Sequence, residues 1–152
     1  MNERREFPDR PLVGVGGVVI RNGRALLIRR ASPPLQDQWS IPGGLLEVGE
    51  TLREGVRREL LEETAIEVRV LELVEVFERI GLDAGGKAKH HFVVLDYLCE
   101  ALRGEACAGS DAAEVAWAAP DELAKYSLGE ATTQVILRAF EMARQQHQDT
   151  YE

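Results

Sequence analysis

The stretch from Gly43 to Ile66 reads GGLLEVGETLREGVRRELLEETAI, and it sets three carboxylates, Glu59, Glu62 and Glu63, at positions i, i+3 and i+4. On a helix these side chains share one face, where like charges repel by roughly a few tenths of a kcal/mol per pair. Such a cluster is either screened by water or occupied by a cation. Hard divalent cations such as Mg²⁺ prefer carboxylate oxygens. Taken alone, a solvated acidic helix face is the commoner meaning.

The neighbouring residues predict a helix that starts just after Thr51. Thr51 and Glu54 have the T-x-x-E spacing of a capping box. Leu52, Val56 and Leu60 recur at helical spacing and form an apolar stripe that faces a core. The three carboxylates lie at the edge of that buried stripe, within about a quarter turn of it. This placement favours a functional acidic cluster over a fully solvated one.

Two glycines, Gly43 and Gly44, precede the helix. Adjacent glycines allow unusual backbone angles and a close approach of the backbone to a ligand. A free carbonyl there, which we assign to Gly43, is a candidate further oxygen ligand for a metal ion.

The spacing of these residues resembles the Nudix box, the signature of MutT-like hydrolases that act on nucleoside diphosphates linked to another group. The matching residues are Gly44, Glu50, Arg58-Glu59-Leu60, Glu62-Glu63 and Ile66. The family has glycine where this chain has Ala65, and that glycine normally ends the helix in a left-handed conformation. Alanine there costs roughly 1 kcal/mol, or else the helix ends differently.

The resemblance implies roles for these residues. Metal ions are held by Glu59, Glu62 and Glu63, with Gly43 as the further metal ligand. Glu50 and Arg58 form an ion pair that, together with Gly44, supports the site. The implied fold is an α/β/α sandwich with a mixed β-sheet between helices, and the implied cofactor is Mg²⁺ or Mn²⁺.

The order of elements agrees with a mixed sheet covered on both faces. Apolar runs predict strands over 12–20, 25–30, 66–80, 90–100 and 114–117, with a break near Leu73, and a final helix over 132–146. The 152 residues predict one domain over 1–152, in which 1–10 and 147–152 are mobile.

Charge, targeting segments and cysteine spacing limit the kinds of protein that this sequence can encode. The net charge of -8 argues against nucleic-acid binding and against binding to anionic membranes. No stretch resembles a signal peptide or a transmembrane span, so a cytoplasmic protein is expected. Cys99 and Cys107 have no zinc-ligand or redox spacing and are predicted to be free thiols.

Arg29 and Arg30 close the second predicted strand, and either can be a solvated arginine. A guanidinium group suits phosphate binding. In similar Nudix enzymes a basic residue at the end of this strand contacts phosphate, which favours Arg30 as the substrate-binding residue. Trp39, which follows the next loop, is predicted to pack in the core rather than to stack on a base.

A late carboxylate is expected to complete the site, because Nudix enzymes often use one as a metal ligand or general base. Glu114 is the chosen candidate, with Asp111 and Glu105 as rivals and an exposed acid without a role as the alternative. The catalytic set is therefore predicted as Glu59, Glu62, Glu63 and Glu114. His90 and His91 point to opposite faces of a strand, so one of them can reach a substrate.

The resemblance implies hydrolysis of a pyrophosphate bond in a small nucleotide substrate. The similarity is strongest to small bacterial ADP-ribose pyrophosphatases, whose products are AMP and ribose 5-phosphate. One alternative is a nucleoside triphosphate pyrophosphohydrolase that includes oxidised nucleotides among its substrates. Another is a non-catalytic nucleotide sensor, which the intact carboxylates disfavour. Similar proteins are often homodimers, but no residue of the sequence decides the oligomeric state.

Overall fold

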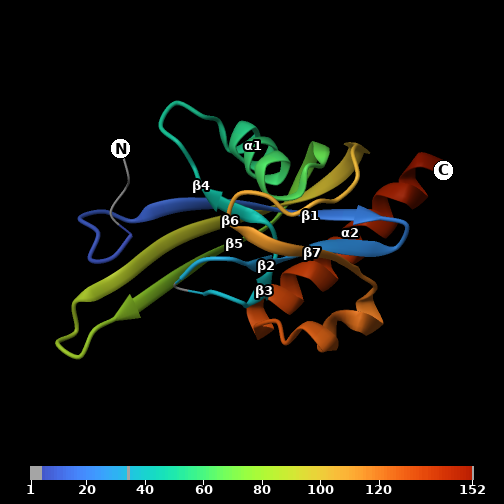
Figure 1. The fold of residues 1–152 in the computed structure, drawn as a ribbon. Coiled ribbons are helices and arrows are strands. Elements are labelled where there is room, and N and C mark those ends of the chain that lie inside the picture. The colour runs from blue at the N-terminus through green and yellow to red at the C-terminus, as the bar shows by residue number, and fades with distance from the viewer. Residues whose placement is uncertain (1–4, 34, 152) are drawn as a thin grey trace.

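A computed structural model describes residues 5–33 and 35–151 and arranges them around one mixed sheet (Figure 1). The strands are β1 (Leu12–Arg21), β2 (Arg24–Arg30), β3 (Trp39–Ser40), β4 (Gly43–Leu45), β5 (Glu67–Leu82), β6 (Ala88–Arg103) and β7 (Ala112–Ala118). The helices are α1 (Leu52–Thr64), the 3₁₀ helix η1 (Pro120–Tyr126) and α2 (Glu130–Tyr151).

The sheet has the order β3-β2-β1-β6-β5, and β4 and β7 pair with β1 and β2 respectively. β1 and β6 run parallel, while the other pairs are antiparallel. β1 pairs with β4 near its start and with β2 only at its end, through Ile20 and Arg21. The sheet therefore opens along one side of β1.

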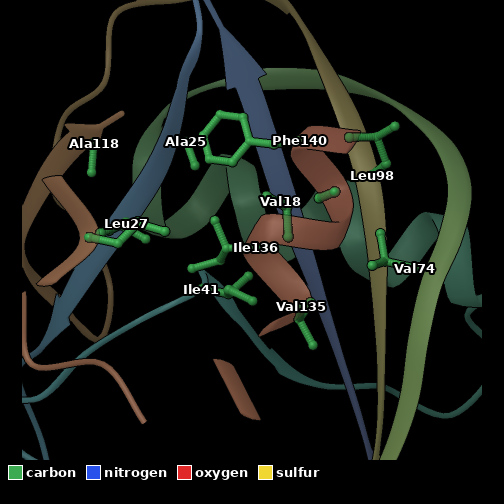
Figure 2. Close-up of a cluster of buried hydrophobic side chains, with 12 residues drawn as sticks. Val18, Ala25, Leu27, Ile41, Val74, Leu98, Ala118, Val135, Ile136 and Phe140 are labelled. Carbon is green, nitrogen blue, oxygen red and sulfur yellow. The ribbon is translucent and has the colours of Figure 1, made fainter. Parts of the chain in front are cut away.

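The two α-helices, α1 and α2, cover opposite faces of the sheet (Figure 1), which confirms the predicted α/β/α sandwich. On one face, Val56 and Leu60 of α1 pack on a cluster that includes Val15 and Leu26. On the other face, α2 packs on a separate cluster, as Figure 2 shows for Ile136 and its neighbours. Burial of each apolar side chain in these clusters contributes roughly 1.5–3 kcal/mol.

The predicted start of α1 is confirmed. Thr51 caps the helix: its Oγ1 accepts from the Glu54 amide at 3.2 Å, while the Glu54 carboxylate accepts from the Thr51 amide at 2.9 Å. At the other end, Ala65 has φ 62° and ψ 12° and donates its N–H to Leu61 at 3.0 Å. The helix thus ends in the left-handed conformation that the family's glycine normally adopts, with alanine in its place.

Several elements are longer than the sequence predicted. β7 begins at Ala112 rather than at 114, and α2 begins at Glu130 and continues to Tyr151. The short strands β3 and β4 were not predicted, because each consists of only two or three residues. β5 runs without a break through Leu73, where a break was expected, but its pairing with β6 shifts register on both sides of that residue.

The expected mobility of 1–10 and 147–152 stays a prediction, and residues 1–4 and 152 lie outside the described part. Cys99 and Cys107 are both free, as expected. Among the described residues, no helix is both long and apolar enough to cross a membrane.

Candidate functional site

The three predicted carboxylates all lie on α1, but they differ in how far they are exposed to solvent. Glu63 is only 3% exposed, whereas the side chains of Glu59 and Glu62 are 13% and 46% exposed. A Cβ at Gly44 would lie 2.6 Å from the Glu59 carboxylate. The glycine at this position of the box therefore makes room for that carboxylate.

Glu63 is the most unusual of the three electrostatically. Burial, reinforced by the neighbouring Glu59 carboxylate, raises the pKa of Glu63 to about 8, although Arg30 and the Gly43 amide oppose the shift. Within the described residues, its buried Oε2 atom has no hydrogen-bond partner. A buried acceptor left unpaired normally costs about 1–3 kcal/mol, so this oxygen is suited to a ligand that the fold itself does not supply.

The predicted ion pair of Arg58 with Glu50 is present in the structure. Its guanidinium binds Glu50 through two hydrogen bonds, of 2.6 Å from Nε and 2.8 Å from Nη2. Nη2 also donates to the Leu45 carbonyl at 3.0 Å, which joins α1 to β4. Hydrogen bonding to Arg58 lowers the pKa of the Glu50 carboxyl and keeps it ionised.

The same guanidinium also reaches the acidic cluster. Nη1 donates to Glu59 at 2.8 Å and to Glu62 at 3.3 Å. In the described part of the chain, no three acidic, histidine or cysteine side chains already converge closely enough to hold a metal ion. Arg58 thus contacts Glu50, Glu59 and Glu62 at once, and its bidentate pair is the one with Glu50.

The two neighbouring arginines of β2 have different partners in the structure. Arg29 donates to Asp37 at 2.8 Å and to Glu114 at 3.3 Å. Arg30 interacts electrostatically with Glu63, and its buried Nε has no hydrogen-bond partner among the described residues. Arg30 therefore lies beside the acidic cluster with an unused donor, whereas the Arg29 guanidinium is already paired.

The structure pairs Glu114 with Arg29, and its role as a metal ligand or general base stays a prediction. Glu114 lies within β7 opposite Arg29 of β2. Its neighbour Val115 packs in the cluster on the α1 face, so Glu114 points to the other face of the sheet. Successive side chains of a strand point to opposite faces of the sheet, and the sequence alone does not tell which face a given residue of β7 takes.

A cavity of about 250 Å³ adjoins the box. Gly43 and Gly44 line it where it meets the box, and Arg30 lines it from β2. Asp111, one of the rivals of Glu114, also lines it, whereas His90, His91 and Glu105 do not. A larger hollow of about 690 Å³ lies between β5 and α2, but it touches none of the box residues.

Sequence reasoning missed much of this cavity. Phe77, Phe92 and Asp96 come from β5 and β6, and they line it together with Trp39. Trp39 also packs against the α2-side core and against Tyr126, with ring centroids 4.9 Å apart, so its predicted core role holds. The one available signal was Asp96 itself, a single acid inside the apolar run FVVLDYL.

Comparison with known proteins shows the family to which this chain belongs. The model of the NUDIX domain matches residues 10–140. The chain belongs to the NUDIX domain family. A MutT-like protein of Streptomyces ambofaciens is 38% identical to this Nudix chain over 82% of the chain and 76% of the relative.

Two further similarities extend the comparison. An ADP-ribose pyrophosphatase of Methanocaldococcus jannaschii is 35% identical over 68% of the chain, and the match spans 59% of that relative's length. The crystal structure of a MutT NUDIX hydrolase from Burkholderia pseudomallei has a TM-score of 0.73 and 32% identity, covering 86% of this chain and 98% of that one. The protein is a Nudix hydrolase, an enzyme class that cleaves pyrophosphate bonds and generally uses divalent metal ions.

The residues of the box fit such a metal ion. All three acidic side chains offer hard oxygen donors, and the orphaned Oε2 of Glu63 supplies a desolvated one. Carboxylate oxygens suit both Mg²⁺ and Mn²⁺.

Proposed function

We propose that this Nudix hydrolase cleaves ADP-ribose to AMP and ribose 5-phosphate. The observation that carries the proposal is the junction of the acidic cluster, Arg30 and the cavity at Gly43 and Gly44. The cavity is slightly smaller than typical small-molecule pockets, which hold ~300–1,000 Å³, so it suits one end of an extended substrate. The similarity to an ADP-ribose pyrophosphatase supports the choice of substrate.

In this proposal Glu59, Glu62 and Glu63, together with the Gly43 carbonyl, hold Mg²⁺ or Mn²⁺. When bound, the cation neutralises phosphate oxygens and activates the attacking water. Arg30 donates to the diphosphate, for which its unused buried Nε is available. One of the three box carboxylates accepts the proton of the water as the P–O bond breaks. Glu50, Arg58 and Gly44 keep α1 and β4 in place.

A hydrolysis screen tests the substrate. ADP-ribose, other nucleoside diphosphate sugars, dinucleoside polyphosphates and nucleoside triphosphates are incubated with Mg²⁺ or Mn²⁺, with an EDTA control. We expect a preference for ADP-ribose, release of AMP, and loss of turnover with EDTA. A preference for another diphosphate derivative would keep the chemistry but reject ADP-ribose as the substrate.

The second candidate is nucleoside triphosphate pyrophosphohydrolysis, including that of oxidised nucleotides. The MutT-like relative and the MutT structure favour it. Release of pyrophosphate from triphosphates at a higher kcat/KM than that for ADP-ribose would establish it. Nucleotide binding without any metal-dependent turnover would instead indicate a sensor.

We also propose that the protein forms a homodimer through β5, the edge strand of the sheet. Val76, Ile80 and Leu82 on this strand are 45%, 51% and 64% exposed. Exposed apolar side chains on an unpaired edge are suited to pairing with a second copy. Light scattering should give the mass of a dimer, and Ile80→Asp should shift it to the monomer. A monomeric wild-type protein at all concentrations would reject the proposal.

A further inference from the structure

One buried acid remains without a role in the proposed hydrolysis. Asp96 lies on β6 and is 4% exposed. Its neighbour Leu98 packs in the α2-side cluster, whereas Tyr97 and Cys99 pack on the α1 side. The Asp96 side chain therefore points to the face opposite the box carboxylates.

Among the side chains that the structure describes, none forms a hydrogen bond or an ion pair with the Asp96 carboxylate. The backbone of Asp96 pairs with β1 and β5, and more than nine-tenths of the residue is buried. Burial raises the pKa of Asp96 to about 6, although Arg79 acts in the opposite direction. Buried acids are normally paired, so an unpaired one indicates a partner outside the chain.

The surroundings direct this carboxylate into the cavity. Gly16 is its register partner on β1, and a Cβ there would lie 2.5 Å from Asp96 Oδ1. Gly16 in turn pairs with Gly43 of β4. The missing side chain at Gly16 therefore leaves space beside the carboxylate. From β6, which carries Asp96, the sheet leads across β1 to β4, which carries Gly43 of the box.

The walls of the cavity fit a planar ring. Phe77, Phe92 and Trp39 line it, and Arg79 lies beside them. Aromatic walls with one polar group at a fixed position are typical of sites that bind a flat, partly polar ligand. An ionised carboxylate only accepts hydrogen bonds, so the ligand must present a donor.

We propose that Asp96 is a specificity-determining residue that accepts a hydrogen bond from the exocyclic amino group of the substrate's nucleobase. The inference rests on the proposed function, in which that base is adenine and the diphosphate extends towards Arg30 and the box. A base with a carbonyl oxygen in place of the amino group would set two acceptors against each other and be rejected.

The test compares ADP-ribose with its hypoxanthine analogue, in which the amino group is replaced by oxygen. We expect the wild type to favour ADP-ribose in kcat/KM by roughly 10–100-fold, mostly through KM, since Asp96 does not touch the scissile bond. Asp96→Asn presents an amide that donates to the oxygen, so the preference should vanish or invert. Glu100→Gln, an exposed acid of the same strand that pairs with Arg69 at 3.6 Å, should keep the wild-type ratio.

A binding measurement keeps this inference separate from the proposed hydrolysis. Calorimetry with AMP and with IMP needs no turnover, and the wild type should bind AMP more tightly than Asp96→Asn does. Failure to hydrolyse ADP-ribose together with Asp96-dependent selection of AMP would reject the substrate but keep the inference. Equal affinity of the wild type for AMP and IMP, or an equal loss for both in the variant, would overturn it.

Discussion

Glu63 and Asp96 are both buried carboxylates with raised pKa values, but they lie on opposite faces of the sheet in different company. Glu63 has Glu59 and Arg30 beside it, and it belongs to a cluster supported by Arg58. For Asp96, burial raises the pKa and Arg79 opposes that shift. A clustered buried acid suits a cation, whereas an isolated one suits a neutral hydrogen-bond donor.

The largest effect is expected at Glu63. Glu63→Gln should lower kcat by about 10²–10⁴-fold, because it replaces one oxygen donor of the metal-binding cluster with an amide nitrogen. The fold should survive, since the amide has nearly the same shape and no buried charge. Steady-state kinetics with saturating Mg²⁺ and circular dichroism measure the two results. Glu67→Gln, an exposed acid that pairs with Arg103 at 3.1 Å, is the matched control, and an unchanged rate in Glu63→Gln would exclude the proposed role.

Removing the charge of Asp96, in contrast, is expected to stabilise the fold. The pKa is about 6 in the folded protein against 3.8 as the ordinary value, which corresponds to at most about 3 kcal/mol of destabilisation when both states are ionised. That cost is complete above pH 6 and disappears as the pH falls towards 4, because the folded state then takes up the proton first. Asp96→Asn should therefore be more stable than the wild type at pH 8.

Denaturant unfolding at several pH values checks this sign. The advantage of Asp96→Asn should shrink steadily from pH 8 to pH 4, while Glu100→Gln should show no comparable trend. A variant that is less stable than the wild type at pH 8 would mean that Asp96 has a stabilising partner. Stability gained at the expense of nucleotide selection is the pattern expected of a binding residue.

These two acids also show how far the sequence alone reaches. The cap at Thr51 and the face shared by the carboxylates are set within one short segment, so spacing predicted them, whereas the pair of Glu50 with Arg58 was implied by the family resemblance. The places of Asp96 and Glu114 depend on which strands pair and in which register. Asp96 meets Gly16 through the parallel pairing of β1 and β6, which connects residues far apart in the chain. The face on which Glu114 lies could not be read from the sequence, because a shift of one residue reverses the face of a strand.

The adjacent arginines offer the next test. Arg30→Gln should raise KM by roughly 10–100-fold, because a charge-assisted hydrogen bond to the diphosphate is lost. Arg29→Gln is the control, since it removes the exposed pairs with Asp37 and Glu114, which contribute little. Substrate titrations of both variants give the comparison. Equal KM changes in the two would show that the position of Arg30 beside Glu63 has no bearing on binding.

The smallest expected effect concerns the end of α1. Ala65 has φ 62°, a left-handed conformation that costs an alanine about 1 kcal/mol. Ala65→Gly relieves this strain, but glycine also increases the freedom of the unfolded chain, so a net gain of a few tenths to about 1 kcal/mol is expected. Asn22→Gly, at φ 54°, should gain less, because asparagine tolerates this region better than alanine. Thermal unfolding measures both, and kcat should stay unchanged, since Ala65 lies beyond the carboxylates. A loss of stability in Ala65→Gly would show that the alanine side chain makes contacts that outweigh its backbone strain.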